Sequence, residues 1–387
     1  MLSVLSDRRK LLTRLGLLAA VTVLAACEPL PATRGNGAAG APVPVALILP
    51  AGSGNSGDEV LATSLRQAAE LAIADLDGVA IDLRVYNAGS DPATSAAMAR
   101  QAVDEGARII LGPVFAEAAN AAGVAVAGSG VNLLSFSNNT DIAGGNVFVL
   151  GPTFQNSANR LTAHAARAGK GRIVIVHGRN AAGELGRRAI AAAAARNGAT
   201  IVGTASYPFS QQGVIAASPG IAAEVRAAGA DAVFLTADTA GALPLLAQLL
   251  PEAGVSPATT QFIGLTRWDI PSATVSMPGV QGGWFALPDP GLSAQFQSRF
   301  MAAYGTPPHP IAGLAYDGIA AIGALARRGS DFSTAALTQG AGFAGVGGVF
   351  RLRADGTNER GLAVAQIQNA KVIVIDPAPR NFGGAGF

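Results

Sequence analysis

The chain is poor in the residue types that most often carry chemistry. Among its 387 residues there are one cysteine and three histidines, and aromatic residues make up 5%. A single cysteine excludes a disulfide within the chain, and His164, His177 and His309 lack the spacing of metal ligands. Charged residues reach only 13%, whereas apolar residues make up half of the chain. This composition indicates sizeable apolar cores and predicts no metal, no cofactor and no nucleic-acid partner.

The one cysteine, Cys27, follows a segment with the features of an export signal. Four basic residues between positions 8 and 14 precede an apolar run over residues 15–23. The run is shorter than the about 20 residues that a spanning helix needs, so residues 1–26 are predicted to be a cleaved signal peptide. Leu-Ala-Ala-Cys at 24–27 resembles the lipobox of bacterial lipoproteins, which implies acylation of Cys27 and a membrane contact through that lipid.

An ordinary signal peptide with an incidental cysteine is the alternative, and the adjacent Arg8 and Arg9 leave the Sec and twin-arginine export routes open. In many lipoproteins an aspartate after the lipidated cysteine retains the protein at the inner membrane. This chain has Glu28 at that position, so the outer membrane is the favoured location.

The leader holds four of the 27 basic and one of the 25 acidic residues. The rest of the chain therefore has 23 basic and 24 acidic residues and a net charge of −1. Residues 27–42 are rich in Pro, Gly and Ala and are predicted to be a flexible tether.

Buried-strand and helix patterns then alternate along the chain. In the first run, strands are expected at 43–49, 81–86, 108–111, 132–136 and 147–150, and helices at 58–76 and 91–105. In the second run, strands are expected at 172–176, 200–206, 232–235 and 261–265, and helices at 183–196, 221–228 and 243–250. Two helices (292–304, 311–327), three strands (350–352, 361–368, 372–375) and a tail (377–387) follow. The pattern predicts an α/β fold with two doubly wound parallel-sheet lobes.

Four segments carry a resemblance to a known family. They are Ile-Leu-Gly-Pro at 110–113, Leu-Ser-Phe-Ser-Asn-Asn at 134–139, Gly-Ala-Asp-Ala-Val-Phe-Leu at 229–235 and Ala-Tyr-Asp-Gly at 315–318. In their order and spacing the chain resembles the type 1 periplasmic binding proteins of the Leu/Ile/Val-binding type. Segments 135–141, 265–270 and 356–362 resemble most closely the penicillin-binding protein activator lipoproteins.

The resemblance implies two lobes joined by a hinge of three crossovers, and no catalysis. The crossovers are expected near 151–152, 287–288 and 345–348. The first lobe would then comprise residues 43–151 plus 288–344, and the second lobe residues 152–287 plus 345–376.

Ligands of open parallel sheets bind beyond the carboxyl ends of the strands. The candidates are therefore polar or aromatic residues in the loops there: Ser53, Asn55, Ser135, Ser137 and Asn138 in the first lobe, and Glu184, Thr236, Asp238, Trp268 and Asp269 in the second. Hydroxyl groups and backbone N–H groups suit a carboxylate, and an acidic side chain suits an ammonium, so the expected ligand is amino-acid-like. Serine and asparagine after a strand are also ordinary turn and cap residues. Trp268 either stacks on a ligand or covers the hinge.

Two departures from the amino-acid receptors stand out. Residues 114–117 read Val-Phe-Ala-Glu where those receptors have serine or threonine, and residues 181–186 lack their aromatic residue. The motif G-x-G-x-x-G at 52–57 is not followed by an acid at the end of the second strand, where Tyr86-Asn87 stands, so a dinucleotide site is not predicted.

Two functions follow. The first is a non-catalytic activator that contacts a peptidoglycan synthase (a penicillin-binding protein). The alternative is a substrate-binding lipoprotein that delivers amino acids or related small molecules to an ABC permease.

Overall fold

The computed structural model describes residues 41–329 and 331–383. The predicted leader, Cys27 and residues 28–40 of the tether lie outside the described residues. Within the part that is described, no helix combines the length and the apolar character needed to cross a bilayer.

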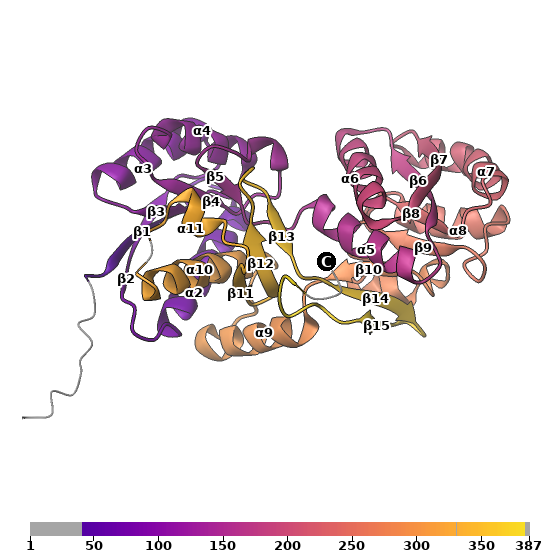
Figure 1. Cartoon of the computed structure of the whole chain (residues 1–387). Helices are drawn as coiled ribbons and strands as arrows, with labels where there is room; N and C mark the ends of the chain where they lie inside the picture. The colour runs from indigo at the N-terminus through magenta and orange to yellow at the C-terminus, as the bar shows by residue number, and fades with distance from the viewer. Residues whose placement is uncertain (1–40, 330, 384–387) are drawn as a thin grey trace, which may run out of the picture. The chain divides into compact units, whose positions relative to one another are not determined.

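The first sheet has five parallel strands in the order β2-β1-β3-β4-β5 (Figure 1). They are β1 (Val43–Leu49), β2 (Ile81–Asn87), β3 (Ile109–Leu111), β4 (Asn132–Ser135) and β5 (Val147–Val149). Alternate residues of β1 enter different cores: Val45 and Leu47 pack with α2 (Ser56–Ala74) and α10 (Gly313–Arg327). Ala46 and Ile48 pack with α3 (Pro92–Asp104) and α4 (Ala116–Val126) on the other face. The continuous apolar run of β1 is thus explained by burial on both faces.

The second sheet has seven strands in the order β15-β14-β10-β9-β8-β6-β7. They are β6 (Arg172–Gly178), β7 (Thr200–Tyr207), β8 (Ala232–Leu235), β9 (Gln261–Gly264), β10 (Trp284–Leu287), β14 (Ala363–Gln368) and β15 (Lys371–Asp376). Strands β6 to β10 are parallel, and β14 and β15 add an antiparallel edge.

Helices cover both faces of the second sheet. One core contains α7 (Gln211–Ala227) and α8 (Leu243–Glu252), and the other contains α5 (Phe154–Arg167) and α6 (Ala181–Asn197). The predicted α/β class with doubly wound parallel sheets is confirmed.

A third, small sheet lies between the first and the second sheet (Figure 1). It comprises β11 (Phe343–Gly345), β12 (Gly348–Leu352) and β13 (Asn358–Arg360), and it follows α9 (Pro290–Tyr304), α10 and α11 (Thr334–Leu337). The 3-10 turns are η1 (Thr140–Ile142), η2 (Ser272–Ser276) and η3 (Pro278–Val280). Phe350 and Leu352 belong to the core of the first sheet, whereas Leu362 belongs to a core of the second.

This division of the cores bears on the predicted lobe boundaries. We propose that the third crossover lies between Leu352 and Leu362 rather than at 345–348, because Leu352 still belongs to the core of the first sheet and Leu362 belongs to a core of the second. The other two crossovers and the rest of the lobe division stay a prediction. In the tail, the ring of Phe382 lies under the guanidinium of Arg351, with 4.5 Å from Cζ to the ring centroid.

Candidate functional site

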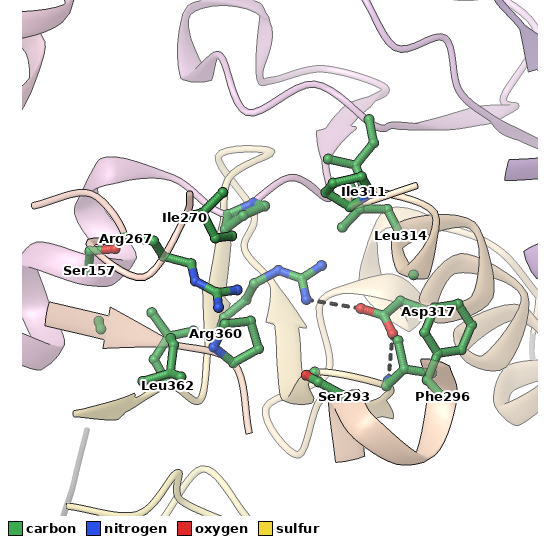
Figure 2. A pocket seen from close by; sticks show the side chains of 18 of the residues that line it. Ser157, Arg267, Ile270, Ser293, Phe296, Ile311, Leu314, Asp317, Arg360 and Leu362 are labelled. Carbon is green, nitrogen blue, oxygen red and sulfur yellow. Dashed lines mark hydrogen bonds and ion pairs between the residues drawn. The ribbon is translucent and has the colours of Figure 1, made fainter. Parts of the chain in front are cut away.

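A cavity of about 390 Å³ opens between elements of the two large sheets. Its walls come from the start of α5, the loop after β9, α9, the loop before α10, α10 itself and the β12–β13 hairpin (Figure 2). A volume of this size suits a small organic molecule. Most lining side chains are apolar, among them Phe154, Leu265, Ile270, Leu287, Phe296, Ile311, Leu314, Val346, Val349 and Leu362.

An enclosed ion pair forms one wall of the cavity. Arg360 Nη1 lies 2.9 Å from Asp317 Oδ2, and the two side chains are 9% and 2% exposed. The second oxygen, Asp317 Oδ1, accepts a hydrogen bond from the backbone N–H of Val346 at 2.8 Å. Burial raises the pKa of Asp317, and the Arg360 charge and hydrogen bond oppose that rise.

The local sequence makes room for this pair. A Cβ atom at Gly345 would lie 2.2 Å from Asp317 Oδ1, so only glycine lets the carboxylate approach the backbone there. Arg360 donates its remaining N–H groups to the carbonyl oxygen of Leu150, at 3.1 Å from Nε and 2.5 Å from Nη2. Arg360 therefore links β13 to both α10 and the end of β5.

Arg267 supplies a second guanidinium to the cavity. It lies in the loop after β9, and its neighbour Trp268 turns the other way into the core of the second sheet, where it is fully buried. Gly264 permits that packing, because a Cβ there would lie 2.2 Å from Trp268 Nε1. The Arg267 side chain is 39% exposed and pairs with Asp269 through Nε and Nη2. Nη1 has no hydrogen-bond partner among the described residues, and Figure 2 shows Arg267 and Arg360 together in the middle of the pocket.

Neutral polar groups complete the lining. Ser157, Thr266, Ser293, Gln297 and His309 all border the cavity. Burial lowers the pKa of His309, and its Nδ1 accepts a hydrogen bond from the backbone N–H of Ile311 at 3.4 Å. A neutral imidazole whose Nδ1 accepts carries its proton on Nε2. His309 is therefore a hydrogen-bond donor at neutral pH.

None of the ten ligand candidates from the sequence lines this cavity. In the first lobe their polar atoms serve the loops themselves. Ser53 Oγ donates to Asp58, and Asn55 caps α2 by accepting from Gly57 N–H. Ser135 is fully buried and donates to the carbonyl oxygen of Pro113, Ser137 accepts from Asn139 N–H, and Asn138 is exposed.

The candidates of the second lobe differ in how close they lie to the cavity. Glu184 pairs with Arg187, Thr236 Oγ1 accepts from Gly178 N–H at 3.4 Å, and Asp238 is exposed. Trp268 packs inside the core of the second sheet. Asp269 does not line the cavity but holds the guanidinium of Arg267, which does. The ligand roles of all ten stay predictions.

Sequence reasoning passed over Arg267, Asp317 and Arg360. Asp317 lies in the segment 315–318 that carried the family resemblance, and Arg267 directly precedes the ligand candidates Trp268 and Asp269. An arginine between Thr266 and Trp268, next to Asp269, was the available signal there. The sequence around Arg360 contains no comparable signal, because its partner Asp317 is 43 residues away.

The sequence model of the periplasmic binding protein family matches residues 42–371. The chain therefore belongs to the periplasmic binding proteins, and its structural neighbours are type 1 members of the Leu/Ile/Val-binding type. A structure from Rhodospirillum rubrum, provisionally assigned to a branched-chain amino acid ABC transporter, superposes with a TM-score of 0.73 at 18% identity, over 86% of this chain and 100% of the other.

Two further structures were solved with solutes. A substrate-binding protein of an ABC transporter from Desulfitobacterium hafniense, in complex with Leu, gives a TM-score of 0.61 at 18% identity, covering 86% and 99% of the two chains. A solute-binding protein from R. palustris, in complex with benzoate, gives 0.56 at 19% identity, covering 89% and 99%. No curated protein matches the chain in sequence. Family and neighbours support the expectation of a binding protein with an ABC permease better than that of a penicillin-binding protein activator.

Proposed function

We propose that this protein is the solute-binding component of an ABC importer and that its cavity takes a small organic carboxylate with an apolar body. The observation that carries the proposal is the guanidinium of Arg267 among apolar walls. Asp269 occupies Nε and Nη2 of Arg267, but Nη1 remains to donate a charge-assisted hydrogen bond to a ligand carboxylate. Burial of a ligand's apolar part among such walls contributes roughly 25 cal/mol per Å².

The polar groups favour a carboxylate over a zwitterion. An ammonium group needs an acceptor, and both carboxylates near the cavity are already paired, Asp317 with Arg360 and Asp269 with Arg267. A carboxylate ligand without an amino group needs only hydrogen-bond donors, and Arg267 and His309 at the cavity are such donors. The neighbours in complex with Leu and with benzoate are consistent with a small carboxylate in this fold.

Calorimetry with matched ligands tests the proposal. The protein is unfolded and refolded to remove copurified solute, then titrated with 4-methylpentanoate and with leucine, which share a side chain and differ in the amino group. We expect 4-methylpentanoate to bind the more tightly. Arg267→Ala should weaken it by about tenfold or more, whereas Arg100→Ala, an exposed arginine on α3, should not. Equal weakening by both variants, or tighter binding of leucine, contradicts the proposed solute class.

The predicted signal peptide over residues 1–26 supports the same proposal, because the binding protein of an importer works outside the cytoplasm. A lipid on Cys27 would keep the protein at a membrane, and an outer-membrane site remains a prediction from Glu28.

A specific observation favours a second candidate, an activator that contacts a peptidoglycan synthase. The groups expected to hold an amino acid, such as Ser135 and Glu184, are engaged in bonds within the chain. Affinity purification from solubilised envelope distinguishes the two candidates. Recovery of an ABC permease supports the importer, and recovery of a synthase together with no solute binding supports the activator.

A further inference from the structure

A second, smaller cavity of about 150 Å³ has a strongly basic lining. Helix α5 contributes Asn156, Asn159 and Arg160, the end of α6 contributes Arg196 and Asn197, and the β12–β13 hairpin contributes Arg353, Glu359 and Arg360. Four arginines and one acid line the cavity, and Arg160 and Arg360 are also paired with Asp376 and Asp317, which do not line it. The volume excludes a large organic ligand and leaves room for one small polyatomic anion.

The acids at this cavity leave positive charge uncompensated. Glu359 Oε2 is shared by Arg351 at 2.7 Å and Arg353 at 2.6 Å, so one carboxylate serves two guanidinium groups. Arg196, in the last turn of α6, is exposed and makes neither an ion pair nor a hydrogen bond within residues 41–329 and 331–383. A cationic cavity with an unpaired arginine at its edge attracts anions.

Arg160 adds a buried donor that is not satisfied. The residue is 5% exposed, and its Nε and Nη2 bind the carbonyl oxygen of Leu362 and the carboxylate of Asp376. Its Nη1 is buried and finds no partner among the described residues. A buried guanidinium N–H without an acceptor costs free energy. Arg160 lines the cavity, so an anion bound there is the candidate for the missing acceptor.

We propose that this cavity binds a small oxyanion of the phosphate or sulfate class. Arginine N–H groups bind such oxyanions through two parallel hydrogen bonds, and arginine stays charged throughout the physiological pH range. The walls come from two different cores: α5 and α6 pack in a core of the second sheet, and the hairpin packs with the first sheet. The bound anion therefore ties the hairpin to the second sheet.

Arg360 borders both this cavity and the solute cavity. Occupancy of either cavity changes the surroundings of the same guanidinium, so we expect each ligand to affect the affinity for the other, and any such effect is reciprocal. The anion site itself does not depend on the proposed solute, since its lining is otherwise separate.

Titration with inorganic phosphate at constant ionic strength tests the site. We expect saturable binding of one phosphate per chain, and we expect Arg196→Glu to weaken it by about tenfold or more. Arg100→Glu is the matched control, because Arg100 is also exposed and helical and lines neither cavity. Arg196 lies in the last turn of α6, where a negative charge opposes the helix dipole, so we expect Arg196→Glu to fold and to lower the unfolding midpoint only slightly. Glycerol 3-phosphate in a parallel titration distinguishes a phosphate ester from the free ion, and tighter binding of either supports the site.

Absence of saturable binding of phosphate and of glycerol 3-phosphate at millimolar concentrations would overturn the proposal. Equal weakening by Arg196→Glu and Arg100→Glu would overturn it as well, because it would indicate attraction to the overall charge of the protein. Failure here leaves the binding of organic acids in the larger cavity unaffected, so the two proposals stand or fall separately.

Discussion

At the scale of single residues, the Asp317–Arg360 pair is the most enclosed ionic contact that the described residues make. The effect of this pair on stability is best measured by removing one of its two partners. Burying two charges consumes much of their attraction, but removing one partner leaves the other charge uncompensated in a medium of low polarity.

We predict that Asp317→Asn lowers the free energy of unfolding by about 3–5 kcal/mol, because it leaves the Arg360 cation enclosed without its partner. Urea denaturation followed by circular dichroism measures the change. Asp91→Asn is the control, since Asp91 caps α3 through its side chain and asparagine caps equally well. A loss in Asp317→Asn no larger than in the control would contradict this account.

Asp376 shows how a partly exposed carboxylate becomes pH-sensitive. Its oxygens lie 2.9 Å from Arg160 Nη2 and 3.0 Å from both His164 Nδ1 and Arg167 Nη2. Burial acts to raise the pKa of Asp376, but hydrogen bonds from Arg160 and His164 and the nearby charges outweigh it and lower the pKa to about 2. Burial lowers the pKa of His164, so that ring is neutral near pH 7.

A carboxylate with a lowered folded pKa stabilises the fold above its unfolded pKa, and that stability is lost as the pH falls towards the folded value. We therefore predict that Asp376→Asn destabilises the protein by at most about 2 kcal/mol at pH 7. The difference from wild type should shrink steadily between about pH 5 and pH 2. Urea midpoints across that range measure it, and a difference independent of pH would count against the assigned pKa.

At the scale of elements, α7 is the clearest case in which packing overrode local sequence. The expected helix was 221–228, directly after Pro219 and Gly220, whereas α7 runs from Gln211 to Ala227 with Pro219 inside it. Val214 and Ser218 before the proline and Ile221 after it are all buried, so one apolar face continues through it. Burial of that face compensates for the hydrogen bond that proline cannot donate.

We predict that Pro219→Ala raises the free energy of unfolding by about 1–2 kcal/mol, because alanine restores the missing N–H at an exposed position. Chemical denaturation measures the gain. Pro92→Ala provides the comparison: Pro92 is at the first position of α3, where no hydrogen bond is lost, and it should bring no gain. Similar effects of the two substitutions would show that the position of Pro219 within the helix does not matter.

Other elements escaped prediction for physical reasons of their own. Helix α4 is rich in alanine and lacks a side-chain cap, so neither its start nor its apolar stripe stands out. Helix α5 begins with a capping box between Thr153 and Asn156, a variant of the usual serine or threonine with glutamate. Strands β11 and β13 have three residues each, too few for a period to be read.

At the scale of the whole molecule, the chain builds two large sheets, each with its own pair of cores. The antiparallel β14 and β15 return to the second sheet after the excursion through α9, α10 and the hairpin. The solute cavity takes its lining from both sheets' elements, which is why its residues span positions 152–362.

The location of the whole protein depends on Cys27, which lies outside the described residues. We predict that the wild-type protein sediments with the membrane fraction of cells and that Cys27→Ser is exported but released in soluble form, because it lacks the site of acylation. Detergent extraction of the wild type serves as the control. Membrane association of Cys27→Ser equal to that of wild type would rule out the lipid anchor.

The sequence by itself determined the class of fold, because buried parallel strands and amphipathic helices leave periodic apolar patterns within short stretches of chain. It also determined which residues follow the strands. Only the tertiary structure decided which of them face a cavity. Arg267 turns outward because Trp268 fills the core beside Gly264, and Arg360 meets Asp317 from another element. Such contacts join residues far apart in sequence, and no local pattern encodes them.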